Sequence, residues 1–330
     1  MRYPALGIDV AQATVAVTLS TDEAVWQHGH FSNDAKGFAQ LKRWVVRQVD
    51  KAVWVCLEAT GRYSDAIAHY LHDEAWVAQV SVLNPSRIHA YARSQMRRSK
   101  TDKTDALLLA HFAATQSPDA WTPPSQQQQA LQELTRHRDN LLDMRQQIRN
   151  RLKAGVRSAE VQRQLQEQEA LLTRQIREVE QEVQQQIEQD ARLHHQFKLL
   201  CSIPGVGPVL ATHFLAEVPD ITRFESASQL AAFAGVVPTQ HDSGTSVKRK
   251  GKLAKTGNVH LRTAFYMPAL SAARYNPLIA AFVARLQAAG KAKMTIVAAV
   301  MHKLLRLAYG VLKSNRPFDP NFAANHQLAS

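Results

Sequence analysis

Ala5-Leu6-Gly7-Ile8-Asp9-Val10 is an apolar run near the start of the chain, and one carboxylate lies close to its end. Apolar and polar residues alternate across positions 4–19, which predicts two short strands. An ionised carboxylate beside a core must be paired, hydrated or bound to a metal ion. The run therefore predicts a strand that carries Asp9 to a functional edge of a sheet.

The next hundred residues alternate between strand-like and helix-like patterns. Three strand-like segments come first, followed by helices and strands in turn, an order typical of an α/β layer with a mixed sheet. The later predicted elements are a strand at 26–31, a helix at 35–48, a strand at 53–57, a helix at 62–74, a strand at 77–83, and helices at 86–95 and 102–115 after a stop at Asn84-Pro85.

The composition changes after Pro124. No proline occurs between Pro124 and Pro204, and the only glycine there is Gly155. Leucine, isoleucine and valine keep near-heptad spacing on both sides of this glycine. The pattern predicts two long helices joined by a break near Gly155 to Ser158, forming an antiparallel hairpin or coiled coil. A single long helix with a kink is the other interpretation.

The remainder of the chain reads as mostly helical. A tight turn at 203–208 opens an apolar helix through Val218. Further predicted helices are 226–234, 258–274 and 292–312, and 313–330 reads as a loosely ordered tail. The fold class is thus α/β plus α, with three units: an α/β domain at 1–122, a helical hairpin at 123–198 and a mostly helical domain at 199–330.

Charge and composition restrict the class of protein. The 330 residues carry a formal charge of +12, which favours a polyanionic partner. No run approaches the roughly 18 apolar residues of a membrane-spanning helix, and the first residues do not resemble a signal peptide. Cys56 and Cys201 lie in apolar segments without metal-type spacing, so we interpret them as reduced core residues of a cytoplasmic protein.

Four carboxylates form the strongest chemical pattern: Asp9, Glu58, Asp102 and Asp105. Asp9 and Glu58 end apolar strands, and the two others lie three apart on one face of a helix. Such a cluster can hold two Mg²⁺ ions about 3.5–4 Å apart for phosphodiester chemistry. Mg²⁺ prefers carboxylate and water ligands.

Each acid also has an ordinary structural explanation. Asp9 could cap a turn, and Glu58 could pair with Arg62. Asp102 could be a helix N-cap, and Asp105 could favour the helix dipole. Caps do not explain why both strand acids end apolar runs, so the set favours a metal-dependent nuclease-like site.

A second candidate site is the glycine-containing basic segment at 241–262. Its flexible backbone and cations suit close contact with phosphates, although a solvated basic loop is the simpler interpretation. Ser243 is a candidate nucleophile that a base or metal would have to activate, and Ser246 is a rival. The candidate nucleic-acid contacts are Arg97, Arg98, Lys100, Lys248, Arg249, Lys250, Lys252, Lys255 and Arg262.

The turn Ile203-Pro204-Gly205-Val206-Gly207 is a third candidate. It could present free amides to a phosphate, like half of a helix-hairpin-helix element, or serve as a structural turn between helices.

The chain resembles the DEDD-type transposases of the insertion-sequence 110 family, the bridge-RNA-guided serine recombinases. The resemblance spans nearly the whole length. The matching stretches are Gly7-Ile8-Asp9, Glu58 to Tyr63, Asn84-Pro85, Lys100 to Ala106, Ile203 to Gly207, Ala231 to Gly235, Pro238, Ser243-Gly244 and Gly257 to Arg262.

This resemblance implies an RNase H-like domain of the RuvC type, a coiled-coil insertion and a C-terminal transposase domain. It implies that Asp9, Glu58, Asp102 and Asp105 hold Mg²⁺ and that Ser243 forms a covalent phosphoserine linkage with DNA. It also implies a structured noncoding bridge RNA that pairs with donor and target DNA. A dimer of dimers, in which one protomer's carboxylates meet another's serine, is expected to act on the nucleoid in a prokaryotic cytoplasm.

Three functions follow from these observations. The first is an RNA-guided DNA transposase or recombinase that uses Ser243 and Mg²⁺. The second is a RuvC-like nuclease that hydrolyses DNA junctions without a serine intermediate. The third is a non-catalytic nucleic-acid scaffold built around the helical hairpin.

Overall fold

A computed structural model describes residues 3–22, 25–95, 101–218, 220–239, 242–243, 247–248, 252–254 and 256–321. The chain divides into two compact units, Met1–Pro123 and Pro124–Ser330. The predicted hairpin and the predicted C-terminal helices lie together in the second unit.

The first unit is built on a five-stranded sheet with the order β3-β2-β1-β4-β5. Its strands are β1 (Ala5–Val10), β2 (Thr14–Asp22), β3 (Val25–Ser32), β4 (Val53–Glu58) and β5 (Val77–Leu83). The first three strands pair in antiparallel fashion, whereas β1–β4 and β4–β5 are parallel. The predicted mixed sheet is therefore confirmed.

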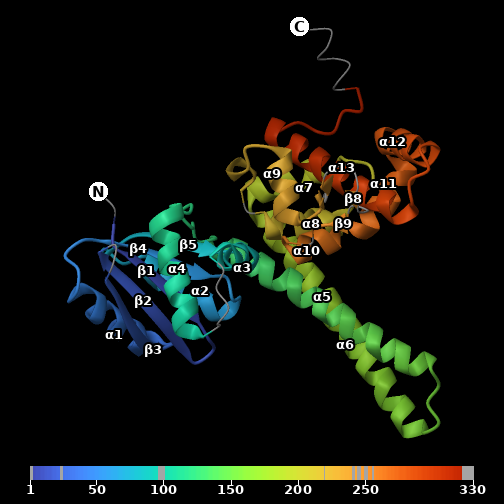
Figure 1. The fold of residues 1–330 in the computed structure, drawn as a ribbon. Coiled ribbons are helices and arrows are strands. Elements are labelled where there is room, and N and C mark those ends of the chain that lie inside the picture. Colours follow the sequence, from blue (N-terminus) through green and yellow to red (C-terminus); the bar gives the residue numbers. More distant parts are fainter. Residues whose placement is uncertain are drawn as a thin grey trace. The chain divides into compact units, whose positions relative to one another are not determined.

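Helices cover both faces of this sheet because alternate strand residues point to opposite sides. Leu6 and Ile8 pack with apolar residues of α1 (Ala35–Val46) and α2 (Arg62–His72). Ala5 and Cys56 pack on the other face, against α3 (Pro85–Ser94) and α4 (Asp102–Gln116). Figure 1 shows α4 lying across that face.

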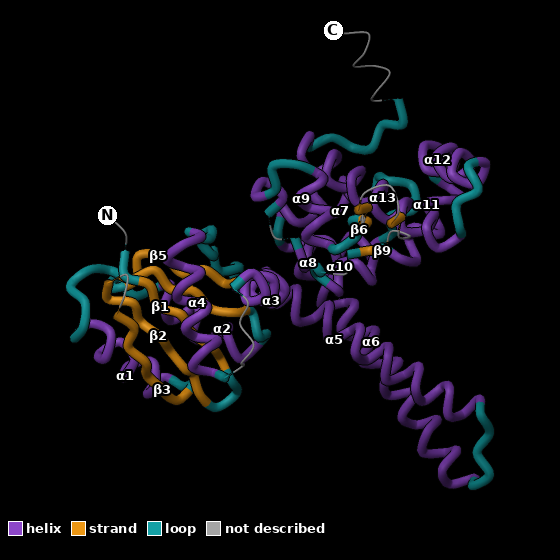
Figure 2. The backbone as a smooth tube through the Cα atoms, viewed as in Figure 1, coloured by secondary structure: helices purple, strands orange, loops and turns teal. Residues whose placement is uncertain are grey.

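The second unit begins with the helical hairpin. Helix α5 (Gln126–Lys153) and helix α6 (Ala159–Gln189) run side by side, joined by a short loop (Figure 2). Leu141, Leu172 and Ile176 form a small core between the two arms. Two helices with a break at 154–158 are thus confirmed, and the single kinked helix is wrong.

Helices of varied length and, among the described residues, four two-residue strands make up the rest of the second unit. Helices α9, α10–α11 and α13 match the predicted segments, whereas α12 and the strands were not predicted. The elements are α7 (Ala191–Cys201), α8 (Pro208–Glu217), η1 (Ile221–Arg223), α9 (Ala227–Ala234), β6 (Pro238–Thr239), β7 (Asp242–Ser243), β8 (Val247–Lys248), β9 (Lys252–Leu253), α10 (Val259–Ala264), α11 (Tyr266–Tyr275), α12 (Pro277–Ala288) and α13 (Lys293–Ser314).

Helix α13 is the central helix of this unit's core. Val300, Leu304, Leu305 and Ala308 are almost fully buried there among residues of the neighbouring helices. By length and composition α13 could cross a membrane, contrary to the expectation that no segment would approach that composition. Its buried face is instead typical of a core helix in a folded unit, and such a helix can be as long and as apolar as a membrane-spanning one.

Both cysteines are free, as expected. Cys56 is buried in the sheet, and burial raises the pKa of its thiol to about 12. Cys201 is half-buried, and burial raises its pKa as well. Neither thiol is an activated nucleophile, because activation requires a lowered pKa.

Candidate carboxylate site and serine segment

Asp9 and Glu58 lie at the carboxyl ends of two neighbouring parallel strands. The paired register of β1 and β4 runs through Gly7↔Cys56 and Ile8↔Leu57, so Asp9 and Glu58 are the next residues on their strands. Residues at matching positions of parallel strands point to the same face. Both acids therefore belong to the face covered by α4, and both are partly exposed.

Helix α4 brings its first turn to the same end of the sheet. A Cβ atom on Gly7 would collide with the backbone of Ala106 and Ala110, so α4 passes directly over β1 at this glycine. Asp102 lines a surface hollow together with Ala16, and Ala16 is the register partner of Asp9 on β2. The two strand acids and the α4 acids thus share one end of the sheet.

The N-cap of α4 is Thr101, not Asp102. The Thr101 side chain accepts a hydrogen bond from the Thr104 amide, and the Thr104 side chain accepts one from the Thr101 amide. This capping box satisfies the helix start without a carboxylate. The predicted N-cap role of Asp102 is therefore wrong, and both Asp102 and Asp105 lie within the first turn instead.

The four carboxylates fit a hard divalent cation in chemistry, since all their donors are oxygens, and they lie at one end of the sheet. They do not form a closed cage. Within the described parts of the chain, no group of three or more His, Cys, Asp or Glu side chains converges closely enough to hold a metal ion.

Two histidines beside Asp102 were not found by sequence reasoning. His28 and His30 lie on β3 and line the same hollow as Asp102 and Lys103. The His28 ring hydrogen-bonds to the Thr18 hydroxyl at 2.9 Å. Burial lowers the pKa of His28, and the charge of Lys103 lowers it further, so this ring is neutral at pH 7. Only the sheet register brings these residues to α4.

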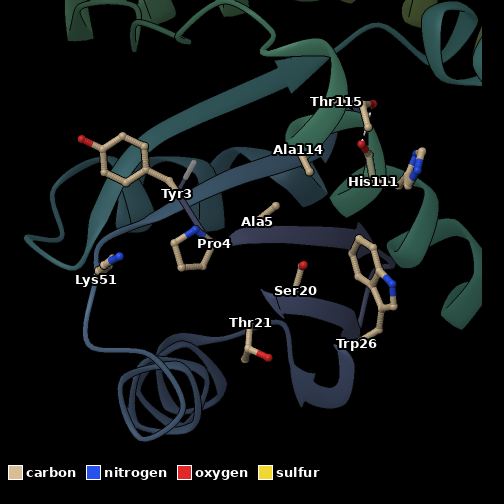
Figure 3. A pocket seen from close by; sticks show the side chains of 10 residues that line it. All are labelled: Tyr3, Pro4, Ala5, Ser20, Thr21, Trp26, Lys51, His111, Ala114 and Thr115. Atoms are coloured by element: carbon tan, nitrogen blue, oxygen red, sulfur yellow. Dashed lines mark hydrogen bonds between the residues drawn. The ribbon is translucent and has the colours of Figure 1, made fainter. Parts of the chain in front are cut away.

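A different pocket lies at the opposite end of β1, and it does not resemble a metal site. This hollow has a volume of about 420 Å³. Figure 3 shows its lining, with Tyr3, Pro4 and Ala5 on one side and Trp26 and His111 on the other. No carboxylate of the described residues lines it. The four candidate carboxylates lie at the other end of the sheet, near Asp9.

Ser243 lies in the second unit, on the two-residue strand β7. Asp242 and Ser243 pair with Lys248 and Val247 of β8 in an antiparallel ladder. A second ladder, β6 with β9, closes the base of this segment through the pair Pro238↔Leu253. We call residues 239–252 the serine segment. Ser246 lies outside the described residues.

The candidate basic contacts are only partly described. Arg97, Arg98, Lys100, Arg249, Lys250 and Lys255 lie outside the described residues, and Lys248 and Lys252 are described as strand residues only. Arg262 is half-buried and donates a hydrogen bond to the Ala234 carbonyl at 3.4 Å. Its guanidinium lies over Gly235, so this arginine also has a structural role.

A buried polar network includes Asn258, which follows the serine segment in the chain. Glu217 of α8 is only 4% exposed and accepts two hydrogen bonds from the Arg136 guanidinium, at 2.9 and 3.0 Å. Asn258 donates to the same carboxylate at 2.6 Å while its side-chain oxygen caps α10. The network therefore ties the hairpin arm α5 to the start of α10. Sequence reasoning missed it because its members are far apart in the chain.

A buried histidine is the neighbour of this network. His213 bonds to the Asp139 carboxylate at 2.9 Å and to the Val209 carbonyl at 2.8 Å. Burial alone would lower the pKa of His213, but the bond to Asp139 and the charge of Asp139 outweigh burial and raise it.

The turn at 203–207 packs against Ala272 of α11 and is hydrogen-bonded by Asn276. Gly205 has φ +99°, and a Cβ there would collide with Ala272 of α11. The Asn276 side chain donates to the Pro204 carbonyl at 3.1 Å. These contacts account for the glycine and the turn without a phosphate.

Comparisons with known proteins cover nearly all of the chain. The sequence model of the family described as "Transposase IS116/IS110/IS902 family" matches residues 197–284, and a DEDD transposase model described as "Transposase" matches residues 6–161. The chain is 35% identical to a pilin gene-inverting protein of Moraxella bovis, over 95% of this chain and 97% of the relative. It is 26% identical to a probable family 20 transposase of Pseudomonas aeruginosa, over 80% and 82%. It is 28% identical to the transposase for insertion sequence element IS1111A of Coxiella burnetii, over 55% and 56%.

Proposed function

The chain belongs to the IS110 family of transposases, and from this premise we propose that it cuts and rejoins DNA through a phosphoserine intermediate at Ser243. The observation that carries the proposal is the placement of Asp9, Glu58 and the α4 acids at one end of the sheet. The strand order 3-2-1-4-5, antiparallel and then parallel, supports an RNase H-like domain of the RuvC type.

In the proposed step the Ser243 hydroxyl attacks a DNA phosphate. A bond forms between Oγ and phosphorus, the bond from phosphorus to the DNA 3′ oxygen breaks, and a base takes the serine proton while the leaving oxygen becomes a 3′-hydroxyl. Attack by the 3′-hydroxyl of another strand reverses the step and frees Ser243. The number of phosphodiester-type bonds is conserved, so no energy-rich cofactor is needed.

Mg²⁺ held by Asp9, Glu58, Asp102 and Asp105, with two ions in the complete site, would neutralise charge that develops on the phosphate. The carboxylates themselves bind and orient this cation at the edge of the sheet. The side chains would have to draw together on binding, since no closed cage exists among the described residues.

Conservative strand exchange is favoured over hydrolysis by one relative. The Moraxella bovis protein is named for gene inversion, and an inversion rejoins every strand that it cuts. A phosphoserine linkage preserves the bond energy that rejoining needs, whereas a junction-hydrolysing nuclease would lose it. We therefore place the hydrolytic function second.

The carboxylates belong to the first compact unit and Ser243 to the second, so we propose a composite site completed between protomers of a tetramer. We assign three functional parts: the DEDD domain (1–122), the hairpin for assembly (123–198) and the serine domain (199–330). A bridge RNA, paired with donor and target DNA, would supply sequence specificity in the prokaryotic cytoplasm. The large positive charge supports such nucleic-acid partners.

Covalent trapping tests the serine. End-labelled DNA, Mg²⁺ and the co-purified RNA are incubated with the protein and denatured, and protein-linked DNA is measured. Wild type and Ser246→Ala should form the linkage, and Ser243→Ala should not. A linkage that survives in Ser243→Ala would overturn the assignment, and cleavage without any linkage would favour the hydrolytic nuclease.

Mixing inactive variants tests the composite site. Asp9→Ala and Ser243→Ala proteins should each be inactive alone. Mixed before assembly, they should regain part of the wild-type linkage, because one intact site can form between them. If no mixing ratio restores linkage although the variants co-assemble, the site is completed within one chain. RNase treatment should abolish cleavage if RNA guides it.

A further inference from the structure

The positive charge of this protein is concentrated in its last third. Residues 226–318 contain fourteen Lys and Arg and a single acid, Asp242. The rest of the chain contains 26 Lys and Arg against 27 Asp and Glu, so it is close to neutral. A polyanion that is attracted by the net charge is therefore drawn to this segment.

The same segment forms a half-open hollow at the base of the serine segment. Its volume is about 890 Å³, and it lies between one face of α13, Phe282 of α12 and the β6–β9 ladder. Pro238 and Leu253, which line it, are the register pair at the base of the serine segment. The hollow thus adjoins the two residues that flank the serine segment in the chain.

The lining of the hollow combines apolar and basic side chains. Leu253, Phe282 and Met294 contribute apolar surface, and Met294 is 63% exposed. Lys303 and Arg306 follow on α13, and no acid lines the hollow among the described residues.

Two cationic side chains lie over the Phe282 ring. Lys303 Nζ lies 5.6 Å from the ring centroid, and the Arg285 guanidinium lies 5.4 Å from it. His302 adds a ring that is neutral at pH 7, because burial lowers its pKa and the charge of Arg306 lowers it further. A neutral imidazole can both donate and accept hydrogen bonds.

We propose that this hollow binds an unstacked nucleotide of single-stranded DNA, with its phosphate on Lys303 and Arg306 and its base or sugar against the apolar side chains of Leu253, Phe282 and Met294. Duplex DNA needs only surface cations, whereas a hollow with apolar side chains and an aromatic ring suits a base that has left the stack. The volume is within the range of roughly 300–1,000 Å³ for small-ligand sites. The assignment of this nucleotide to the strand cut at Ser243 rests on the proposed function.

Binding of short oligonucleotides tests the proposal without any chemistry. Fluorescence anisotropy is measured on the full chain carrying Ser243→Ala, with labelled twelve-nucleotide oligothymidine, a hairpin duplex and oligouridine. Lys303→Gln/Arg306→Gln should weaken oligothymidine binding about tenfold or more. It should also reduce the salt slope by about 1.4, since each lost phosphate contact contributes about 0.7 for single strands.

Two further variants distinguish binding in the hollow from binding to the positive charge of the surface. Arg274→Gln/Arg316→Gln removes the same charge at exposed positions outside the lining and should cost much less. Ala298→Phe fills the hollow while keeping its cations, so it should weaken oligothymidine binding but leave duplex binding unchanged.

Equal losses in the two charge variants, or wild-type binding by Ala298→Phe, would overturn the proposal. If Lys303→Gln/Arg306→Gln or Ala298→Phe weakened oligouridine binding but left oligothymidine binding unchanged, the proposal would also be overturned, and the hollow would be assigned to RNA. Thermal melts confirm folding of each variant. Oligonucleotide binding is measured without cleavage, so its result does not depend on covalent trapping. A negative binding result would overturn the proposal for the hollow and leave the assignment of Ser243 unaffected.

Discussion

The backbone carbonyl of Ala106 occupies the space that a Cβ atom on Gly7 would need. Helix α4 therefore lies against β1 backbone to backbone, and the first turn of α4 comes to the end of the strand that carries Asp9. A side chain at position 7 would push the helix away from the sheet. The glycine thus positions Asp102 and Asp105 relative to Asp9.

We predict that Gly7→Ala destabilises the first unit and impairs cleavage. Its methyl group would collide with backbone, which cannot rotate away as a flexible side chain could. Overpacking of this kind costs about 1–3 kcal/mol. Chemical denaturation and covalent trapping measure the two effects.

The control for this prediction is Gly310→Ala. Gly310 lies within α13, and its Cβ would meet nothing within 4 Å. Alanine favours a helix interior, so the variant should be about 0.5–1 kcal/mol more stable. Equal stability of Gly7→Ala and wild type would show that α4 does not need this close approach.

We predict that neutralising the carboxylates stops cleavage but preserves the fold. Asp9→Asn, Glu58→Gln and Asp102→Asn should each reduce the rate of linkage formation about 10²–10³-fold, as loss of one preorganised electrostatic group does. The three side chains are partly or fully exposed, so thermal melts should change little. Asp73→Asn, at the exposed end of α2, is the matched control and should retain the wild-type rate.

Much of the first unit could be predicted from sequence because its strands alternate regularly and its helices have clear starts. The apolar runs of the sequence also predicted that two strands end near Asp9 and Glu58. The register of β1 with β4, which makes these acids neighbours, was not visible, because pairing between distant strands leaves no local signal. Nor was the role of Gly7, since a close backbone approach depends on a helix a hundred residues away.

The second unit shows the same limit. The hairpin was predicted from its apolar spacing and the break at Gly155. The buried carboxylate of Glu217 was not, because its partners Arg136 and Asn258 come from other helices. The strands of the serine segment are two residues long, too short to produce a periodic pattern.

We predict that Arg136→Met destabilises the second unit by about 3–5 kcal/mol. The Arg136 side chain is 41% exposed, but Glu217 is almost fully buried, so removing Arg136 leaves a buried carboxylate without its cation. Chemical denaturation measures the loss. Arg174→Met is the control, because its pair with Glu178 is exposed on both sides and should contribute about 1 kcal/mol or less. Equal losses would show that Glu217 is stabilised without Arg136.

We predict that the stability of the second unit depends on pH through the His213–Asp139 pair. The pKa of His213 is raised in the folded state, so protonated His213 stabilises the fold. This contribution is fully present below the ordinary pKa of 6.5 and is lost as pH rises through the higher folded value. We therefore expect the Tm difference between wild type and Asp139→Asn to be larger at pH 6 than at pH 8.5. Each ~1 kcal/mol should appear as about 2–4 °C.

His260 must be separated from this effect because it titrates with the opposite sign. Burial lowers the pKa of His260, and the charge of Arg136 lowers it further, so its contribution to stability is lost as pH falls. Asp139 also acts on His260, and the comparison is therefore repeated in a His260→Gln background. If the Tm difference in that background is the same at both pH values, Asp139 does not stabilise a protonated His213.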